Sequence, residues 1–173
     1  MLKPQDILIA LAIIIQKGEQ WRQTDIAAEL GISPSEVNAG IKRLIHSKLM
    51  EPGFHGKKPS VVVSALKEFL IHGCKYVFPA EIGGKARGIP TSYAAPIFKN
   101  EISHKEDDKP VWPDAKGHVQ GYALMPLYPS VNQIQNEVLY SLLALVDAIR
   151  SGRARERNIG IKLLEEKLNE YAA

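Results

Sequence analysis

The sequence predicts a mainly α-helical protein with a small amount of β structure. Apolar residues recur at helical spacing towards both ends of the chain. Between them, residues 76–130 hold seven of the eleven prolines and five glycines, which excludes long regular helices there. We therefore expect three segments: residues 1–75, a Pro/Gly-rich α+β segment over 76–130, and two C-terminal helices within 131–173.

The first two helices are predicted from the residues at their ends. Pro4 suits the first turn of a helix whose apolar periodicity continues to about Gln16. A shorter helix is expected from about Gln23 to Leu30. Gly31 follows it directly and is typical of the residue just past a helix end.

The third helix has the strongest start signal in the chain. Ser33 can cap it, Pro34 suits its first position, and Glu36 would complete a capping box. One face is apolar, and the opposite face is polar and basic. The residues expected inward are Val37, Ile41, Leu44, Ile45 and Leu49, and those expected outward are Ser35, Asn38, Lys42, Arg43 and His46.

A short β-hairpin is expected after the third helix. Gly53 and Gly56 bracket a turn between two stretches that could pair as strands, and this turn carries His55, Lys57 and Lys58. Helical spacing also runs from about residue 59 or 60 to 71. The sequence leaves the boundary between hairpin and helix open.

The rest of the chain is expected to combine short strands with two helices. Strands are predicted around residues 76–78, 92–95 and 119–123, with a turn at 83–85 and an exposed charged loop over 104–109. Helices are predicted over about 131–150, buried on most sides, and over about 153–171. The last helix has a stripe that could pack against the body of the protein or against a second copy, and from it we expect a homodimer. The stripe consists of Ile161, Leu164, Leu168 and Tyr171.

The order of the first elements is that of a winged helix-turn-helix, spanning roughly residues 4–62. Its third helix would lie in the major groove of double-stranded DNA, where hydroxyl and amide groups exchange hydrogen bonds with bases. The excess positive charge agrees, because residues 1–75 hold 10 basic against 7 acidic residues while the remainder is balanced. The expected DNA contacts are Gln23, Thr24, Ser35, Asn38, Lys42, Arg43, His46, His55, Lys57 and Lys58.

The stretch QTDIAAELGISPSEVNAGIKRLIHSKLME also resembles the winged helix-turn-helix of bacterial MarR-like regulators. Shared features are the alanine of the second helix, the glycine turn and the IKRL sequence of the recognition helix. The resemblance covers about a third of the chain and implies sequence-specific DNA binding as a dimer, commonly to repress transcription. Gly40 departs from it, at a cost of about 1 kcal/mol relative to alanine in a helix.

The middle segment offers a second candidate region, for a small ligand or a protein partner. Its members are Tyr76, Phe78, Arg87, Tyr93 and Trp112. The alternative is that these loops simply fold over the C-terminal helices. With this region comes an alternative function, that of an antitoxin-like or adaptor protein which uses the winged helix as an interaction module.

Other chemistries lack the residues they need. We expect no enzyme activity, no cofactor and no metal, because His72 and Cys74 have no second pair at ligand spacing and Gly83-Gly84-Lys85 lacks the order of a phosphate-binding loop. A single cysteine suits a reducing compartment. The first apolar run, residues 7–15, is too short to span a bilayer. We expect a cytoplasmic protein.

Overall fold

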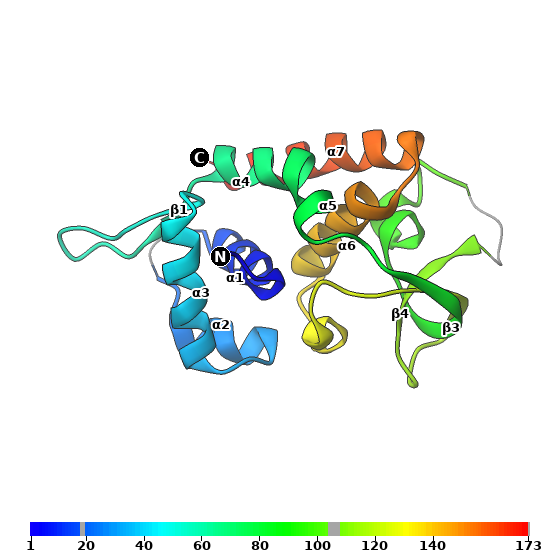
Figure 1. The fold of residues 1–173 in the computed structure, drawn as a ribbon, viewed down its shortest axis with the longest axis horizontal. Helices are drawn as coiled ribbons and strands as arrows, with labels where there is room; N and C mark the ends of the chain where they lie inside the picture. The colour runs from blue at the N-terminus through cyan, green and yellow to red at the C-terminus, as the bar shows by residue number, and fades with distance from the viewer. Residues whose placement is uncertain (18–19, 104–107, 173) are drawn as a thin grey trace.

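A computed structural model describes residues 1–17, 20–103 and 108–172, and it confirms a mainly helical protein with small sheets (Figure 1). The helices and single turns of helix are α1 (Pro4–Ile15), α2 (Gln23–Leu30), α3 (Pro34–His46), α4 (Val63–Glu68), η1 (Phe69–Gly73), α5 (Cys74–Val77), η2 (Ser92–Ala94), η3 (Pro96–Phe98), η5 (Pro129–Gln133), α6 (Glu137–Ser151) and α7 (Ala154–Asn169). The strands are β1 (Met50–Glu51), β2 (Ser60–Val61), β3 (Ile82–Pro90), β4 (Pro110–Pro113) and β5 (Val119–Leu124).

The first three helices begin and end where their local signals predict. Gly31 adopts the left-handed conformation, with φ at +65°, and closes α2. The hydroxyl of Ser33 accepts a hydrogen bond from the Glu36 backbone N–H at 3.2 Å and caps α3. The predicted capping box is only half formed, because the Glu36 carboxylate turns instead to Arg43 and Gln5.

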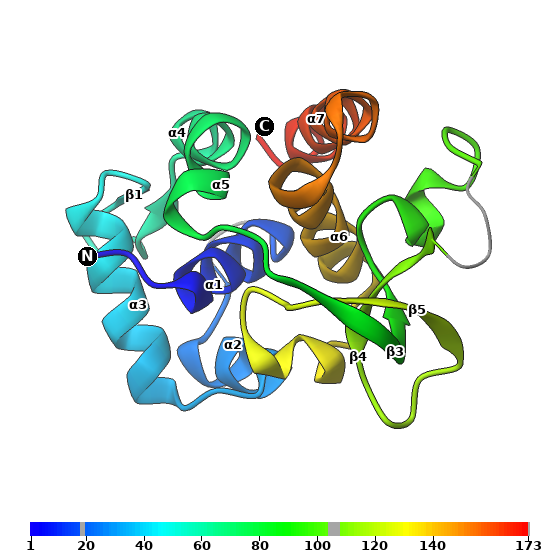
Figure 2. The same ribbon diagram turned by 45° about the vertical axis from the view of Figure 1, so that its right-hand side comes forward.

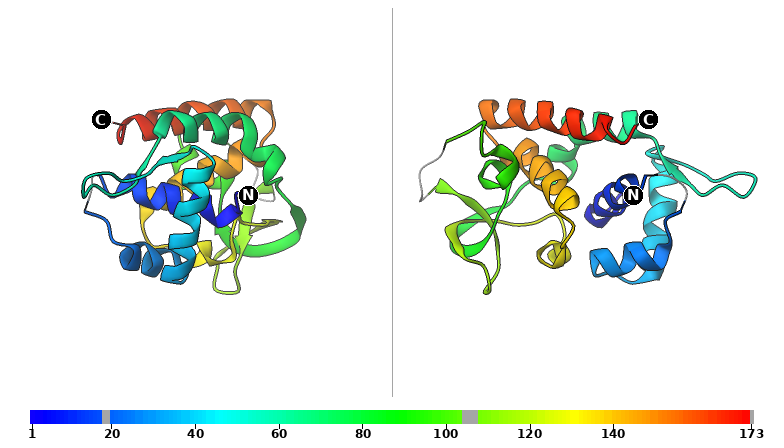
Figure 3. Two further views of the ribbon diagram at one scale, coloured as in Figure 1. Left: turned by 60° about the vertical axis from the view of Figure 1, so that its left-hand side comes forward. Right: turned by 180° about the vertical axis from the view of Figure 1, so that it is seen from behind.

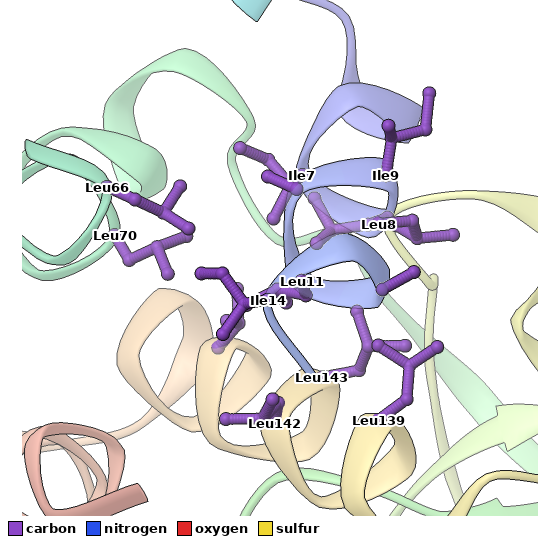
Figure 4. Packing of buried hydrophobic residues seen from close by; sticks show 14 of the residues in the cluster. Ile7, Leu8, Ile9, Leu11, Ile14, Leu66, Leu70, Leu139, Leu142 and Leu143 are labelled. Atoms are coloured by element: carbon purple, nitrogen blue, oxygen red, sulfur yellow. The ribbon is translucent and has the colours of Figure 1, made fainter. Parts of the chain in front are cut away.

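Helix α1 lies at the centre of the molecule (Figure 2). Its residues from Asp6 to Ile14 are all buried, because α2 and α3 pack against it on one side and α6 on another. Figure 4 shows leucines of α6 and of the α4–η1 run around the α1 side chains. Helical periodicity predicted one buried stripe on α1, whereas the tertiary structure buries every side of it.

The hairpin is confirmed, and its strands are only two residues long. Strand β1 pairs antiparallel with β2, and the loop between them extends away from the body (Figures 1 and 3). The chain then stays helical over residues 63–77, through a π-helical turn at η1. The predicted strand at 76–78 is wrong, because buried residues continue at helical spacing through Leu66, Leu70 and Cys74.

The middle segment forms one three-stranded sheet. Strand β3 pairs antiparallel with both β4 and β5, and β4 pairs parallel with β5, so that the strands close on themselves. The strand predicted at 119–123 is confirmed. The turn predicted at 83–85 is wrong, because these residues lie in β3 beside an irregularity in its pairing with β5. The strand predicted at 92–95 is also wrong, because these residues begin with the 3₁₀ turn η2. Pro90 and Pro96 flank them, and proline has no N–H to donate to a neighbouring strand.

Both C-terminal helices are present, but α6 begins at Glu137, six residues later than predicted, where the Asn136 side chain accepts from the Leu139 N–H. Helix α7 packs along α6 and also contacts α4. Leu164 and Leu168, from the predicted stripe, are fully buried within the single chain. Ile161 and Tyr171, its other two members, are only half-buried. The stripe therefore packs in part against the body of the protein, and the expected homodimer stays a prediction.

The three segments share one hydrophobic core rather than forming separate ones. Buried residues of α1, α4, β4, α6 and α7 belong to the same cluster. Of the predicted charged loop, 104–107 lies outside the described residues, and Asp108 is exposed. None of the described helices combines the length and the apolar character needed to cross a membrane.

Candidate nucleic-acid interface

One face of α3 is open to solvent at the end of the molecule that also carries the hairpin (Figure 1). The exposed side chains are those of Ser35, Asn38, Lys42 and His46, which follow one another at about one helical turn. The opposite face, formed by residues such as Val37 and Leu44, is buried. The helix thus presents four of the five residues predicted to face outward.

Arg43 is the exception. Its Nη2 donates to Asp6 Oδ1 at 2.7 Å and its Nε to Asp6 Oδ2 at 2.8 Å, so the guanidinium holds that carboxylate with two parallel bonds. Nη2 also lies 2.5 Å from Glu36 Oε1, and the Arg43 side chain is only 17% exposed. The prediction of an outward DNA contact is wrong for Arg43, because a fully buried Asp6 requires a counter-charge.

Asp6, Glu36 and Arg43 form one charged cluster beside the exposed face. Hydrogen bonds from Arg43, and then from Gln5, lower the pKa of Glu36, and the bond to Asp6 raises the pKa of Arg43. Glu36 is the acidic residue of α3, and it shares Arg43 with Asp6, so two carboxylates stand against one guanidinium and the cluster keeps a net charge of −1. The four exposed side chains of α3 are themselves neutral or basic.

Gly40 allows α3 to approach α1 closely. A Cβ at this position would lie 2.4 Å from Ile9 Cδ1 and 3.0 Å from Asp6 Oδ1. Both atoms belong to fully buried residues, which have little space to move. Gly40 is therefore a packing requirement of this chain.

Two of the three basic residues expected on the hairpin are exposed to solvent, and the third is not. His55 and Lys57 are exposed, and His55 has a left-handed backbone with φ at +52°. Lys58 is half-buried instead: its ammonium donates to the Trp21 carbonyl and lies 5.0 Å from the centre of the Trp21 ring. Phe54, which no pattern in the sequence singles out, has a side chain that is 66% exposed on the same loop.

The start of α2 completes the interface. Gln23 and Thr24 are exposed in its first turn, where backbone N–H groups have no partner within the helix. Such donors are suited to phosphate oxygens. Helix α2 precedes α3 through the Gly31 turn, so these residues lie on the element that packs directly against α3.

The five residues of the second candidate region do not converge on one site. Trp112 is buried, and its Nε1 donates to Asp147 Oδ2 at 2.7 Å. Phe78 packs edge-on against Phe69. Tyr76 and Arg87 are exposed, and the Tyr93 hydroxyl is 2.9 Å from that of Tyr122.

Asp147 connects the middle segment to α6. Its Oδ2 accepts from Thr91 as well as Trp112, and its Oδ1 lies 2.8 Å from Arg150 Nη1. Arg150 in turn donates to the Phe78 carbonyl at 2.8 Å. Burial raises the pKa of Asp147, whereas the charge of Arg150 opposes that shift. This network favours the interpretation in which the middle segment folds over the C-terminal helices.

Cys74 and His72, two residues apart in the sequence, lie in different environments. Burial raises the pKa of the Cys74 thiol to about 11, so the thiol is protonated at neutral pH, while His72 is exposed. Within residues 1–17, 20–103 and 108–172, no three His, Cys, Asp or Glu side chains gather closely enough to hold a metal ion.

Comparison of the chain with models of protein families, with characterised proteins and with solved structures finds no match. Function is therefore inferred from the chemistry of the exposed surface. Its main elements are the open face of α3, the hairpin and the first turn of α2.

Proposed function

We propose that residues 4–62 are a winged helix-turn-helix that binds double-stranded DNA, and that the protein is a sequence-specific transcription regulator. The observation that carries this proposal is the solvent face of α3, whose four exposed side chains are neutral or basic: Ser35, Asn38, Lys42 and His46. The hairpin with His55 and Lys57 extends at the same end of the molecule (Figure 3). Repression by a dimer, as in the MarR-like regulators that the sequence resembles, is part of the proposal.

The dimensions agree with this mode of binding. An α-helix with its side chains is about 10–12 Å across and enters a major groove about 12 Å wide. Asn38 can pair with an adenine edge and Ser35 with several bases, whereas Lys42 suits guanine or phosphate. His55 and Lys57 would follow the neighbouring backbone, and Gln23 and Thr24 would bind phosphates. Arg43 and Lys58 are not part of the proposed contacts, because each is held by other residues of the chain.

The test is a fluorescence anisotropy titration against DNA from upstream of the protein's own gene and against scrambled duplex, at several salt concentrations. We expect preferential binding whose affinity falls steeply with salt. Lys42→Ala should weaken binding to both duplexes and reduce the salt slope by about 1. Asn38→Ala should reduce the preference for the specific duplex by about 1–3 kcal/mol.

The matched control is Lys116→Ala, an exposed lysine between β4 and β5. This variant removes the same charge from the sheet end of the molecule. Equal losses in the Lys42 and Lys116 variants would mean non-specific attraction and would overturn the placement of α3 on DNA. Absence of salt-dependent binding would overturn the proposal itself.

Dimerisation has a separate test, because Leu164 and Leu168 of the stripe from which it was expected are buried within the single chain. Light scattering at micromolar concentration measures the mass directly. A mass twice the 19.2 kDa of one chain would support a dimeric regulator that uses another surface. A mass of one chain would overturn the dimeric part of the proposal.

Exposed apolar side chains favour the adaptor function as a second candidate. Two of them are at the end of α5 and one is at the start of β3. The fourth directly follows β5, beside the start of β3, because the Met125 N–H donates to the Glu81 carbonyl. The residues are Tyr76, Val77, Ile82 and Met125. An adaptor should lose a purified partner upon Ile82→Ser and keep it upon Lys42→Ala, whereas a DNA regulator should show the opposite pattern for DNA.

A further inference from the structure

A groove lies between the hairpin and the C-terminal end of α7, with a volume of about 690 Å³. It is lined by the C-terminal end of α1, by Trp21, by the hairpin and by Glu170 and Tyr171, so residues far apart in the sequence meet there. Figure 3 shows the end of α7 close to the hairpin in its left view. Small-molecule sites occupy about 300–1,000 Å³, which includes this volume.

Aromatic rings line this groove. Trp21 and Tyr171 contribute from its inner side, and Phe54 stands on the hairpin with most of its ring exposed. An exposed phenylalanine next to a concave surface offers a flat apolar face on which a planar base can stack. The hairpin thus gives the groove a recognition element for an aromatic group.

Lysines bring positive charge to the same place. The Lys17 ammonium lies 5.0 Å from the centre of the Tyr171 ring, and that of Lys58 the same distance from the Trp21 ring. Lys57 is exposed and has no ion-pair partner among the described residues. Lysine ammonium groups are common phosphate ligands.

Two carboxylates complete the lining. Glu51 on β1 and Glu170 after α7 are both exposed. Against three lysines they leave the groove with a net charge of +1, which favours an anion. Carboxylates accept hydrogen bonds from hydroxyl groups, so they suit the sugar of a ligand whose other parts are a planar ring and a phosphate.

We propose that this groove binds a mononucleotide, with its base against Phe54, its phosphates on Lys17 and Lys57, and its ribose hydroxyls on the carboxylates. Nucleotide binding does not depend on the DNA function and is measured without DNA. One consequence does rest on the proposed function. A nucleotide bound at the base of the hairpin would change the contacts of the hairpin with DNA and hence the affinity for DNA.

The test is isothermal titration calorimetry of the full chain with ADP, GDP, CDP and UDP. Adenosine and pyrophosphate serve as the two halves of the ligand. We expect at least one nucleoside diphosphate to bind tenfold or more tightly than either half, because stacking and charge recognition then act together. Phe54→Ala and Lys57→Ala should each weaken binding about tenfold, and Lys116→Ala should leave it unchanged. Both groove residues are exposed, so their replacement leaves the core intact.

Several outcomes would overturn the nucleotide assignment. If pyrophosphate bound as tightly as the nucleotides, the groove would be a site for anions and would not recognise the base. Unchanged affinity in both groove variants would show that the nucleotide binds elsewhere on the protein. If none of the four diphosphates bound, the proposed nucleotide site would be wrong. Tighter binding of an oligothymidine, lost in the Phe54 variant, would show that the groove takes single-stranded nucleic acid instead. None of these results depends on whether α3 binds duplex DNA.

Discussion

Asp6 is fully buried and accepts hydrogen bonds from the Arg43 guanidinium and from the Lys3 backbone. This single carboxylate joins the first turn of α1 to the middle of α3. It also changes the role of Arg43, from the DNA contact that helical periodicity predicts to a residue that holds α3 against α1.

Replacing Asp6 by alanine should therefore destabilise the protein strongly. The variant leaves the Arg43 guanidinium partly buried without its main partner, and breaking such a pair costs about 3–5 kcal/mol. Urea denaturation measures the free energy of unfolding. Asp25→Ala, which removes an exposed carboxylate from α2, should change it by less than about 0.5 kcal/mol. Equal small losses in the two variants would contradict this role of Asp6.

Glu36 should make the free energy of unfolding depend on pH. Its pKa is lowered in the folded state, chiefly by the hydrogen bond from Arg43, so the folded state favours the ionised form. The resulting stabilisation is present above the ordinary value of 4.5 and is lost as the pH falls through the lower folded pKa. Glu36→Gln should therefore lose more stability at pH 7 than at pH 3. A loss that does not vary with pH would contradict the ionic role of Glu36.

Cys74 should be unreactive in the folded protein. Burial raises its pKa to about 11, and the thiolate is the reactive form. Ellman's reagent at pH 8 should modify the thiol slowly in buffer and rapidly in concentrated urea. Fast modification of the native protein would show that the α5 region opens readily.

At the scale of the element, α3 combines two surfaces with different requirements. Its solvent face needs polar and basic groups for the proposed function, while its inner face must approach α1 more closely than an alanine permits. Gly40 meets the second requirement at the cost of helix propensity. The two requirements are compatible because they occupy opposite sides of the same helix.

Gly40→Ala should test this balance. In an ordinary helix interior the substitution stabilises by about 1 kcal/mol. Here the added methyl group would meet the fully buried side chains of Ile9 and Asp6, and overpacking of this kind costs about 1–3 kcal/mol. We expect a net loss in thermal unfolding experiments. Asn38→Ala on the exposed face provides the control, and a more stable Gly40 variant would show that α1 gives way.

At the scale of the whole molecule, the proposed DNA-binding module is not an independent unit. Helix α1 belongs to it by sequence, yet α1 is also buried against α6. Buried residues of α7 extend the same core. A destabilising substitution in α7 should therefore also lower the stability of the N-terminal helices.

Leu164→Ala in α7 should demonstrate this coupling. Loss of a fully buried leucine costs about 2–5 kcal/mol, and the shared core should spread this loss over the chain. Hydrogen exchange of the α1 amides should accelerate together with that of α7. The exposed neighbour provides the control as Lys162→Ala. Unchanged protection of α1 would indicate that the segments unfold separately.

Local signals in the sequence determined the helices of the N-terminal part closely. Pro4, Ser33 and Gly31 act on backbone groups within a turn of themselves, so their effects can be read without knowledge of the fold. Apolar spacing likewise predicted the exposed face of α3. The middle segment was predicted less well, because prolines and glycines exclude helices without specifying which strands pair.

Only the tertiary structure decided which polar groups are withdrawn from the surface. Arg43 and Lys58 are held by Asp6 and Trp21, each 37 residues away along the chain. Leu164 and Leu168 of the α7 stripe are buried by their own chain, and the groove at the hairpin combines residues 13–63 with the C-terminal residues 170 and 171. Periodicity shows which side of a helix is apolar or charged. What lies opposite that side depends on contacts between distant residues, which local spacing does not contain.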